Sequence, residues 1–465
     1  MASYKKLGKD IILMTIGSFG SKLISFFFVP FYTAVLTTEE YGISDLVTTT
    51  VTLLFPFFSA IICEAMMRFA LERDNEPKEV WKVGCRITII GIIVFLLVSP
   101  SILFTIFKPY YKYIVAYFVT YTIHSNISYF IRGINKVKIF AISGIFQTFC
   151  IVIFNFIFLL WLKLGIRGYL SALIVATMFS IIYMVLWSGI YKFGCDIVHV
   201  DKELQKGMLK YSLPMIPNSI SWWIANVSDR YILTAFCGVA ATGVYAVAYK
   251  IPTIITTLSS IFGRAWKLSA VDNFGSIESK KFFEDVFSKL SALLVLSASA
   301  LMLLNKPLSS ILYRKEFYQA WQFVPVLVMA AVVHAYIEFI GAIYTSAYKT
   351  KFLVISTGLG AGINIVFNFL LIPFYGAMGA AIATLIGYLV TWISRSIDSR
   401  KIMKLQYKLK RDVVCYIFVT IQILVATKGG RYEFSISLVI FFCILFMMFG
   451  EIKHVFCMAL KNIRR

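Results

Sequence analysis

Fourteen apolar stretches run through this chain of 465 residues and constrain its fold more than any other feature. A helix needs roughly 20 apolar residues to cross the hydrocarbon core of a bilayer. None of the stretches alternates polar and apolar residues as a membrane-spanning β-strand does. With 59% hydrophobic and 15% charged residues, the chain also has too little polar surface to cover a soluble globule. We therefore predict an all-α integral membrane protein with about 14 transmembrane helices. They are expected at 11–36, 43–67, 87–107, 113–131, 139–162, 168–190, 213–236, 243–263, 290–305, 323–347, 352–374, 376–394, 413–427 and 434–452.

The distribution of basic residues predicts the orientation of these helices. If the N-terminus lies in the cytoplasm, the cytoplasmic segments carry 33 of the 45 Lys and Arg residues, the external segments carry nine and the spans carry three. Short loops rich in Lys and Arg stay on the cytoplasmic side of a membrane. We therefore expect a multi-pass protein with both termini in the cytoplasm. Its net charge of +22 then faces the anionic lipids of the inner leaflet and requires no nucleic-acid partner.

An internal repeat indicates how the helices are grouped. Residues 154–156 read Phe-Asn-Phe, and after a short apolar run Gly-Ile-Arg-Gly at 165–168 opens a new helix. Residues 367–369 again read Phe-Asn-Phe, and Gly-Ala-Met-Gly follows at 376–379. Because each copy contains six predicted helices, an even number, the two copies run in the same direction. The repeat therefore predicts two six-helix lobes related by a pseudo-two-fold axis along the membrane normal, the architecture of transporters that bind substrate between two halves.

This repeat divides the chain into four predicted parts. An N-lobe at 1–192 contains helices 1–6, and a polar cytoplasmic linker at 193–212 joins it to the next lobe. A C-lobe at 213–394 contains helices 7–12. A basic loop and two further transmembrane helices, at 395–465, lie outside the repeat.

Several motifs resemble those of one transporter family. The opening at 15–24, Pro30-x-Tyr32, and Leu-Thr-Thr-Glu-Glu-Tyr-Gly at 36–42 resemble the start of bacterial polysaccharide flippases of the O-antigen type. Asp-Arg-Tyr-Ile-Leu at 229–233 and the stretch 376–384 are similar to two further signatures of that family. It belongs to the multidrug, oligosaccharidyl-lipid and polysaccharide exporter superfamily. The resemblance covers roughly residues 8–395 of the chain.

The resemblance implies a function and a substrate class. Such a flippase moves an oligosaccharide linked to a polyprenyl diphosphate across the bacterial cytoplasmic (inner) membrane by alternating access. The product serves the synthesis of surface polysaccharide, either capsule or the O-antigen of lipopolysaccharide, so the polysaccharide polymerase machinery is an expected partner. The resemblance does not identify the sugar or the coupling ion.

Three basic residues fall inside predicted spans, where a charge costs at least about 2.5–3.5 kcal/mol. Lys22 lies near the centre of the first helix, about 17 Å along it from the cytoplasmic end. Arg230 and Lys250 lie at similar depths on the seventh and eighth helices. We predict that all three line a cationic cavity for a diphosphate, because a guanidinium forks onto phosphate oxygens and an ammonium adds a point charge. The alternative is structural pairing, for which Asp229 is the nearest charge partner of Arg230 and Lys250, or snorkelling of Lys22.

His334 and Glu338 are the candidates for ion coupling. They lie four residues apart on the tenth predicted helix and therefore share one face. Because histidine titrates near neutral pH, the pair could carry a coupling proton. The alternative, which we favour, is a buried hydrogen bond that only supports packing.

Sequence motifs for chemistry are scarce in this chain. It contains no H-E-x-x-H zinc pattern, no C-x-x-C pair and no G-x-x-x-x-G-K-[ST] phosphate loop. We therefore predict that the chain has no catalytic residues, no metal site, no cofactor and no nucleotide partner. We also predict that it is not an enzyme. Two other functions stay open: a cation-coupled multidrug exporter of the same superfamily, and a membrane polysaccharide polymerase or ligase. An exporter suits a more acidic cavity, and a polymerase is expected to carry a large external loop.

Overall fold

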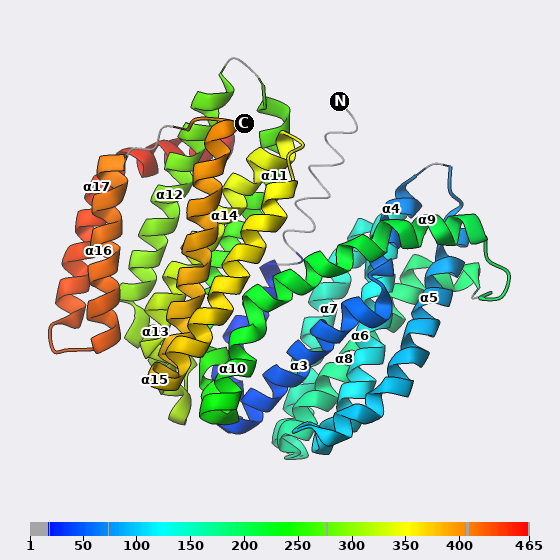
Figure 1. The fold of residues 1–465 in the computed structure, drawn as a ribbon. Helices are drawn as coiled ribbons and strands as arrows, with labels where there is room; N and C mark the ends of the chain where they lie inside the picture. The colour runs from blue at the N-terminus through cyan, green and yellow to red at the C-terminus, as the bar shows by residue number, and fades with distance from the viewer. Residues whose placement is uncertain are drawn as a thin grey trace. The chain divides into compact units, whose positions relative to one another are not determined.

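The structure, a computed structural model, describes residues 17, 19–72, 74–194, 196–275, 278–405 and 409–463. Within these ranges the chain forms helices joined by turns and short irregular segments, and it contains no β-strand (Figure 1). The prediction of an all-α protein is confirmed.

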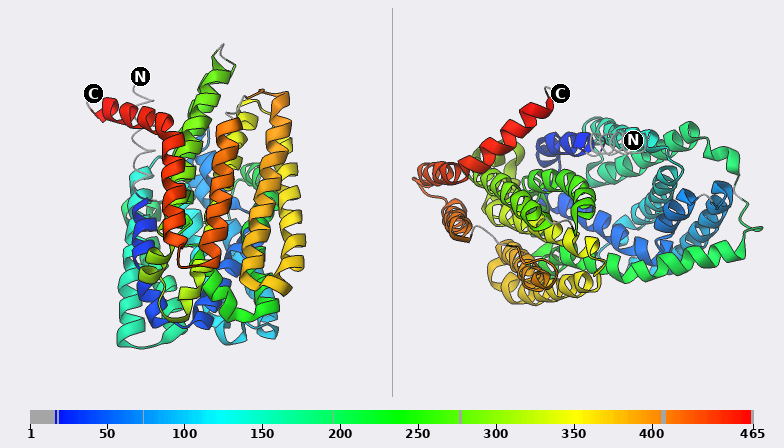
Figure 2. Two further views of the ribbon diagram at one scale, coloured as in Figure 1. Left: turned by 90° about the vertical axis from the view of Figure 1, so that its left-hand side faces the viewer. Right: turned by 90° about the horizontal axis from the view of Figure 1, so that it is seen from above.

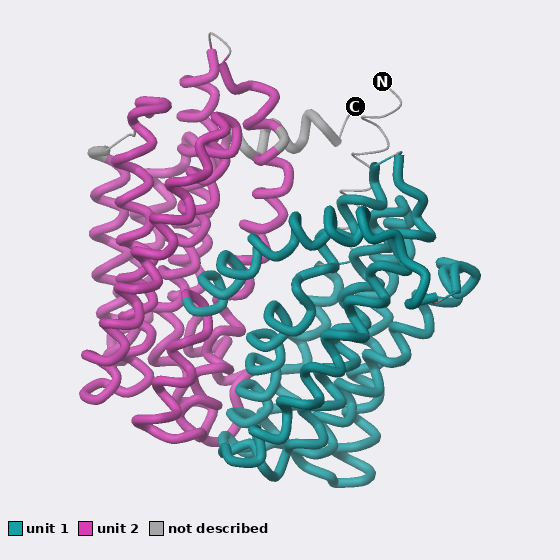
Figure 3. Tube along the Cα trace, turned by 45° about the vertical axis from the view of Figure 1, so that its right-hand side comes forward, with its two compact units in different colours: residues 1–224 teal, residues 225–465 magenta. Residues whose placement is uncertain are grey.

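The chain divides into two compact units, residues 1–224 and residues 225–465 (Figure 3). The boundary falls inside α10 (Ile216–Ala248). The first turns of α10 belong to unit 1, where the indole N–H of Trp223 donates to the carbonyl of Thr49 at 3.0 Å. The division into lobes and linker at 192 and 213 stays a prediction.

Unit 1 is built around α6, which packs against α3, α4 and α8. Two clusters of buried apolar side chains hold these helices together, one around Phe130 and Met66 and the other around Phe118 and Val47. The helices of unit 1 are α2 (Val29–Val35), α3 (Thr38–Ser59), α4 (Ile62–Leu71), α5 (Pro77–Val98), α6 (Tyr111–Gly133), α7 (Val137–Asn155), α8 (Gly165–Ser188) and α9 (Lys202–Ser212).

Unit 2 is built around α14, which packs against α11, α12 and α15. Its aromatic core stacks Trp266 on Phe339, with ring centroids 4.5 Å apart. After α10, the helices of unit 2 are α11 (Thr253–Asn273), α12 (Ser279–Leu303), α13 (Asn305–Leu312), α14 (Val324–Ser346), α15 (Lys351–Asp398), α16 (Leu409–Lys428) and α17 (Glu433–Ile463).

Eight helices in the described part of the chain are long and apolar enough to cross a membrane. A ninth candidate is the pair Val239–Ala248 and Thr253–Lys267, whose axes bend by 52° at a break. The described residues of the first predicted span form a shorter apolar helix, Phe19–Val35, whereas 11–16 and 18 lie outside the described residues. The protein is a multi-pass helical membrane protein, and the total of fourteen spans stays a prediction.

The second predicted span is broken rather than continuous. α3 ends at Ser59, and Ala60 and Ile61 adopt the left-handed conformation before α4 begins. The Ser59 hydroxyl accepts a hydrogen bond from the backbone N–H of Ile61 at 3.1 Å, which replaces the helical partner that this group loses. The apolar run from 43 to 67 gave no indication of this break, because hydropathy does not depend on backbone direction.

Two long helices each contain a reversal of the chain at a glycine. α10 reverses at Gly238 (φ 84°, ψ 170°) and α15 at Gly376 (φ 53°, ψ −132°). The two legs of α15, coloured yellow and orange, run side by side in Figures 1 and 2. A Cβ added to Gly360 on one leg would lie 2.8 Å from the carbonyl oxygen of Gly387 on the other, so the two backbones are in close contact. The first leg of α10 and the two legs of α15 correspond to the predicted spans 213–236, 352–374 and 376–394. The predicted span 243–263 is broken, because it comprises the second leg of α10, the break at 249–252 and the start of α11.

The first glycines of the two Gly-x-x-Gly motifs have similar backbone conformations. Gly165 and Gly376, the first glycine of each, both have positive φ, of 55° and 53°. A Cβ at the second glycine of either motif would meet the preceding helix: at Gly168 it would lie 3.0 Å from the Phe158 carbonyl oxygen, and at Gly379 2.5 Å from that of Leu371. The two units therefore each contain a glycine turn of the kind that the internal repeat predicts.

Polar contacts fix the last two helices to the rest of unit 2. On α16, Gln422 is 0% exposed and exchanges two hydrogen bonds with Ser299 of α12, at 2.7 and 3.0 Å. At one end of the α16–α17 hairpin Ser288 of α12 donates to Glu451 at 2.9 Å and accepts from Arg411 at 3.1 Å. At the other end the carboxylate of Glu433 pairs with Lys306. The hairpin is therefore a fixed part of unit 2.

Candidate functional site

Asp229, on α10, is only 2% exposed and lies in a nest of hydroxyl groups. Its Oδ2 accepts hydrogen bonds from the hydroxyls of Tyr245 at 2.8 Å and Tyr249 at 3.1 Å. The same oxygen accepts a third hydrogen bond from Thr384 Oγ1 at 3.3 Å. The other oxygen, Oδ1, accepts the backbone N–H of Arg230 at 2.9 Å. Hydroxyl groups and a backbone amide therefore stabilise this buried carboxylate.

A line of polar side chains continues from Asp229 into α15. Asn364 Nδ2 donates to Thr384 Oγ1 at 3.5 Å, and Asn368 Nδ2 donates to Asn364 Oδ1 at 3.0 Å. Both asparagines are buried, 3% and 0% exposed. We call Asp229, Thr384, Asn364 and Asn368 the polar ladder. It connects the first leg of α10 with both legs of α15.

Arg230 and Lys250 come from neighbouring segments of unit 2. The Arg230 guanidinium lies 5.2 Å from the centre of the Tyr249 ring, and Tyr249 directly precedes Lys250. Lys250 is half-buried in the break between Val239–Ala248 and Thr253–Lys267. Its ammonium forms no hydrogen bond or ion pair with any residue that the structure describes. Lys22 lies in unit 1, exposed on the helix Phe19–Val35.

His334 and Glu338 each contact a different helix. The Glu338 carboxylate pairs with Lys267 of α11, with 3.4 Å between Oε2 and Nζ. The His334 ring lies next to the Tyr388 ring of α15, with centroids 5.3 Å apart. The Tyr388 hydroxyl in turn donates to Asn226 at 2.8 Å, which brings His334 close to the seventh predicted helix.

Sequence reasoning gave no role to several side chains that build this site. Tyr245, Tyr249 and Thr384 satisfy Asp229, but tyrosine and threonine are common in membrane helices and their spacing gives no distinct signal. Arg395 was placed in the basic loop, yet it lies in α15, 3% exposed. Its guanidinium donates to Ser356, Thr357 and the carbonyls of Ile337 and Leu353. It therefore ties α14 to both legs of α15.

The chemistry of the polar ladder favours a small cation. Among the described residues, no group of three or more His, Cys, Asp or Glu side chains could hold a metal ion. The ladder instead offers one carboxylate together with hydroxyl and amide oxygens, a donor set that suits a hard cation or a proton. The Oδ1 of Asn368 is buried without a hydrogen-bond partner among the described residues, so one acceptor of the ladder is still available.

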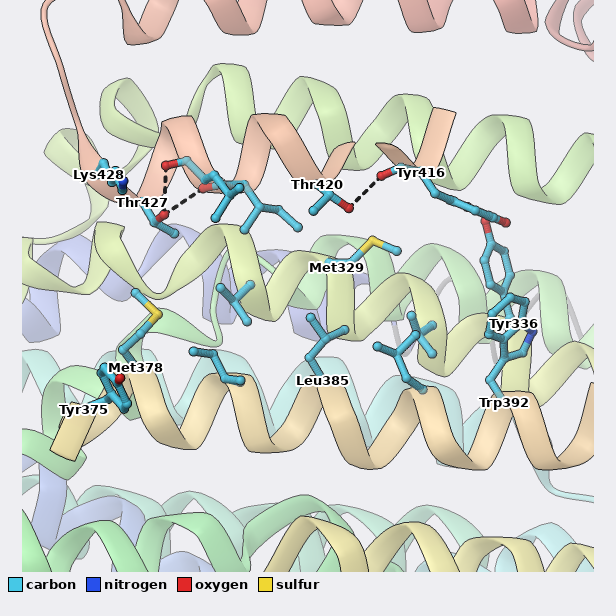
Figure 4. A pocket seen from close by; sticks show the side chains of 16 residues that line it. Met329, Tyr336, Tyr375, Met378, Leu385, Trp392, Tyr416, Thr420, Thr427 and Lys428 are labelled. Atoms are coloured by element: carbon cyan, nitrogen blue, oxygen red, sulfur yellow. Dashed lines mark hydrogen bonds between the residues drawn. The ribbon is translucent and has the colours of Figure 1, made fainter. Parts of the chain in front are cut away.

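An apolar pocket of about 750 Å³ lies elsewhere in unit 2 (Figure 4). α14, the second leg of α15, and α16 line it, with Tyr375 and Lys428 near one end and Trp392 and Tyr416 near the other. It contains none of the predicted site residues.

Residues 7–266, more than half of the chain, match the family described as Polysaccharide biosynthesis protein. Two relatives are uncharacterized membrane proteins of Methanocaldococcus jannaschii. MJ1068 is 24% identical over 52% of this chain and 49% of its own length, and MJ1375 is 25% identical over 82% and 94%. The third, the probable low-salt glycan biosynthesis flippase Agl15 of Haloferax volcanii, is 22% identical over 51% of each chain. The chain thus matches about half the length of two of these relatives.

Solved structures of low sequence identity share the fold. The lipid II flippase MurJ in an inward closed conformation aligns with a TM-score of 0.72, at 13% identity, over 98% of this chain and 100% of that one. An inward-facing multidrug resistance transporter of the MATE family, in the MOP superfamily, aligns with a TM-score of 0.61, at 14% identity, over 88% and 96%. The two-unit helical bundle is therefore a transporter fold.

Proposed function

Because the chain belongs to the polysaccharide biosynthesis protein family, we propose that it is a flippase for a polyprenyl-diphosphate-linked oligosaccharide. It works by alternating access and serves the synthesis of surface polysaccharide. The likeness of its fold to a lipid II flippase, and a relative named as a probable flippase of glycan biosynthesis, support this function. It acts as a transporter rather than as an enzyme.

The environment of Lys250 is the observation that supports an anionic substrate. A half-buried ammonium without an anionic partner is costly in a membrane helix, and such charges mark substrate or ion pathways. Asp229, the nearest carboxylate in sequence among the predicted site residues, is already satisfied by hydroxyls. Lys250 therefore offers its charge to a ligand. The diphosphate of the lipid carrier is such a ligand, with the Arg230 guanidinium of the same unit as a second cation.

The polar ladder is the proposed coupling site. A transporter without a nucleotide motif draws on an ion gradient or on the membrane potential. The buried carboxylate of Asp229 and the oxygens of Thr384, Asn364 and Asn368 would bind Na⁺ or a proton. We place the coupling ion here in preference to the His334–Glu338 pair, because Glu338 already has Lys267 as its partner.

The proposed location is the cytoplasmic membrane of a bacterium, with both termini in the cytoplasm. The excess of basic residues in the predicted cytoplasmic segments supports this orientation. The polysaccharide polymerase machinery is a proposed partner, since it consumes the product on the outer side.

Transport by the purified protein tests the function. The protein is reconstituted in liposomes with a fluorescent lipid-linked oligosaccharide, and a membrane-impermeant reductant reports the fraction of fluorophore in the outer leaflet. We expect wild-type protein to exchange the lipid between leaflets. Lys250→Ala should slow this exchange at least about tenfold, because one unpaired charge contributes more than about 1.4 kcal/mol.

The control variant is Lys206→Ala, which removes an exposed lysine of α9 and should exchange the lipid at the wild-type rate. No exchange by well-folded wild-type protein would overturn the flippase proposal. Efflux of a cationic dye in its place would support the multidrug exporter.

A further inference from the structure

A row of tyrosines winds along α6 in unit 1. Tyr113, Tyr117 and Tyr121 follow one another at four-residue steps and cover an arc of about 80° on one side of the helix. Tyr129, eight residues further on, lies about 80° further round. The row is about 24 Å long at 1.5 Å per residue, close to the roughly 30 Å of a hydrocarbon core. All four side chains are half-buried. We call these residues the tyrosine strip.

The rings of the strip are held in place by neighbouring aromatic groups. The Tyr121 ring meets Phe55 of α3 edge to face, with centroids 5.4 Å apart, and lies 5.9 Å from the ring of Tyr117. Tyr113, Tyr117 and Tyr121 also pack against the buried apolar cluster that contains Phe118. The positions of the hydroxyl groups are therefore fixed before any ligand binds.

Two of the four hydroxyl groups of the strip lack partners among the described residues, whereas the Tyr121 hydroxyl is hydrogen-bonded to Ser125 and the Tyr129 hydroxyl to Arg132. The hydroxyls of Tyr113 and Tyr117 form no hydrogen bond with any residue in the described part of the chain. Tyr111, which lies off the strip on the same helix, pairs its hydroxyl with Ser99 at 2.9 Å. An unpaired hydroxyl is costly in an apolar setting. Phenylalanine, which the chain uses 42 times, would pack equally well without that cost.

Charged groups complete one end of the strip. The Arg132 guanidinium lies 3.9 Å above the centre of the Tyr129 ring and 4.8 Å from that of Phe140. Its Nε is buried without a hydrogen-bond partner among the described residues. Glu64, on α4, lies close enough to Tyr129 to interact with it electrostatically. Along α6 and the neighbouring α4, unit 1 thus presents aromatic faces, hydroxyls, a guanidinium and a carboxylate.

We propose that the tyrosine strip, with Arg132 and Glu64, binds the sugar residues of the lipid-linked substrate. Aromatic rings stack on the apolar faces of sugar rings, while tyrosine hydroxyls, a guanidinium and a carboxylate exchange hydrogen bonds with sugar hydroxyls. A row of repeated, similar contacts accommodates several sugar units without requiring one fixed position. This inference rests on the proposed flippase function and assigns the glycan to unit 1.

Binding measurements on the full-length protein in nanodiscs test the strip. The two probes are lipid-linked oligosaccharides extracted from the source organism, and polyprenyl diphosphate that carries no sugar. Tyr113→Phe and Tyr117→Phe remove one hydroxyl each and keep the packed rings. Each should weaken binding of the sugar-bearing lipid about three- to tenfold, the effect of one hydrogen bond. Binding of the bare carrier should not change.

The matched control is Tyr191→Phe, which removes the hydroxyl of an exposed tyrosine of unit 1 outside the strip. It should bind both probes as the wild type does. If both strip variants bound the sugar-bearing lipid with wild-type affinity, the proposed role of the strip would be wrong, while the flippase proposal would still stand. Equal weakening for both probes would show a folding defect and also overturn the role of the strip. Failure of wild-type protein to bind either probe would instead overturn the flippase function itself.

Discussion

The Phe-Asn-Phe motif allows a direct comparison of the two units. In unit 1 the amide of Asn155 donates to the carbonyl of Ile151 at 2.8 Å and to the Tyr32 hydroxyl at 3.3 Å, and among the described residues it forms no further hydrogen bond. In unit 2 the amide of Asn368 donates to Asn364, whose contacts continue to a buried carboxylate. The asparagine of the Phe-Asn-Phe motif therefore supports helix packing in unit 1, whereas in unit 2 it belongs to a hydrogen-bonded chain that ends at a carboxylate.

The residues around the two asparagines account for this difference. The position one turn before the asparagine is Ile151 in unit 1 and Asn364 in unit 2. Five residues after the second glycine of the motif stand Leu173 and Thr384, respectively. Asn364 and Thr384, which replace the apolar residues of unit 1, thus supply the side chains that extend the Asn368 contact into the polar ladder. Because a buried charge destabilises a membrane helix, the presence of Asp229 at the end of the ladder, where the described counterpart in unit 1 has no charge, argues for a function in transport.

The largest expected effect is that of removing the charge at the end of the ladder. Asp229→Ala leaves three hydroxyl groups without their acceptor and should lower the free energy of unfolding by about 3–5 kcal/mol. Asp229→Asn keeps the shape and should still reduce transport more than about tenfold, since a neutral amide does not bind the coupling ion. Transport in liposomes and thermal unfolding in detergent measure the two effects.

Asn155→Ala in unit 1 is the matched control. It removes an equally buried amide and should reduce stability while leaving the transport rate per folded molecule unchanged. Full transport by Asp229→Asn would show that the ladder, like its counterpart in unit 1, only supports packing.

The all-helical fold and the two glycine turns could be predicted from the sequence, because hydropathy and backbone geometry at glycine are local properties. Long apolar runs locate the helices, and Gly165 and Gly376 mark turns that need a positive φ. The break at Ala60 and Ile61 could not be predicted, since neither residue favours a left-handed backbone.

The partners of site residues were much harder to predict than their positions. Asp229 stood out as a charge within a span, but its partners Tyr245 and Thr384 lie 16 and 155 residues away in sequence. Arg395 follows an apolar run and looks like a loop residue until α15 is seen to continue to Asp398. Pairings of this kind depend on how helices pack, and a single sequence does not contain that information.

The two glycine motifs give the next comparison. A Cβ at Gly379 would lie 2.5 Å from a backbone oxygen of the preceding helix, whereas at Gly168 the nearest atoms are 3.0 Å away. Gly379→Ala should therefore cost about 2–3 kcal/mol and Gly168→Ala about 1 kcal/mol. Thermal unfolding of the two variants measures the difference. Equal losses would show that the two turns are equally tight, in conflict with the distances.

A smaller effect on stability is expected from removing the Glu40 carboxylate in unit 1. The Glu40 carboxylate caps the start of α3 and also accepts the backbone N–H of Ile166, at 3.1 Å, near the start of α8. Glu40→Ala should cost about 0.5–2 kcal/mol, because it removes a capping partner from two helix N-termini. Glu39→Ala, one position earlier, is the control and should change the unfolding temperature less. A larger loss for Glu39→Ala would contradict the double cap.

The smallest expected effect concerns Glu338, which tests whether the polar ladder alone couples transport to an ion. Its ion pair with Lys267 is partly exposed, with 32% and 58% of the two side chains accessible, so it should contribute no more than about 1 kcal/mol. Glu338→Gln should therefore unfold near the wild-type temperature and keep the wild-type dependence of transport on pH. His334→Gln should behave in the same way if the histidine only packs against Tyr388. A pH profile that shifts in Glu338→Gln but not in Asp229→Asn would move the coupling site from the ladder to α14.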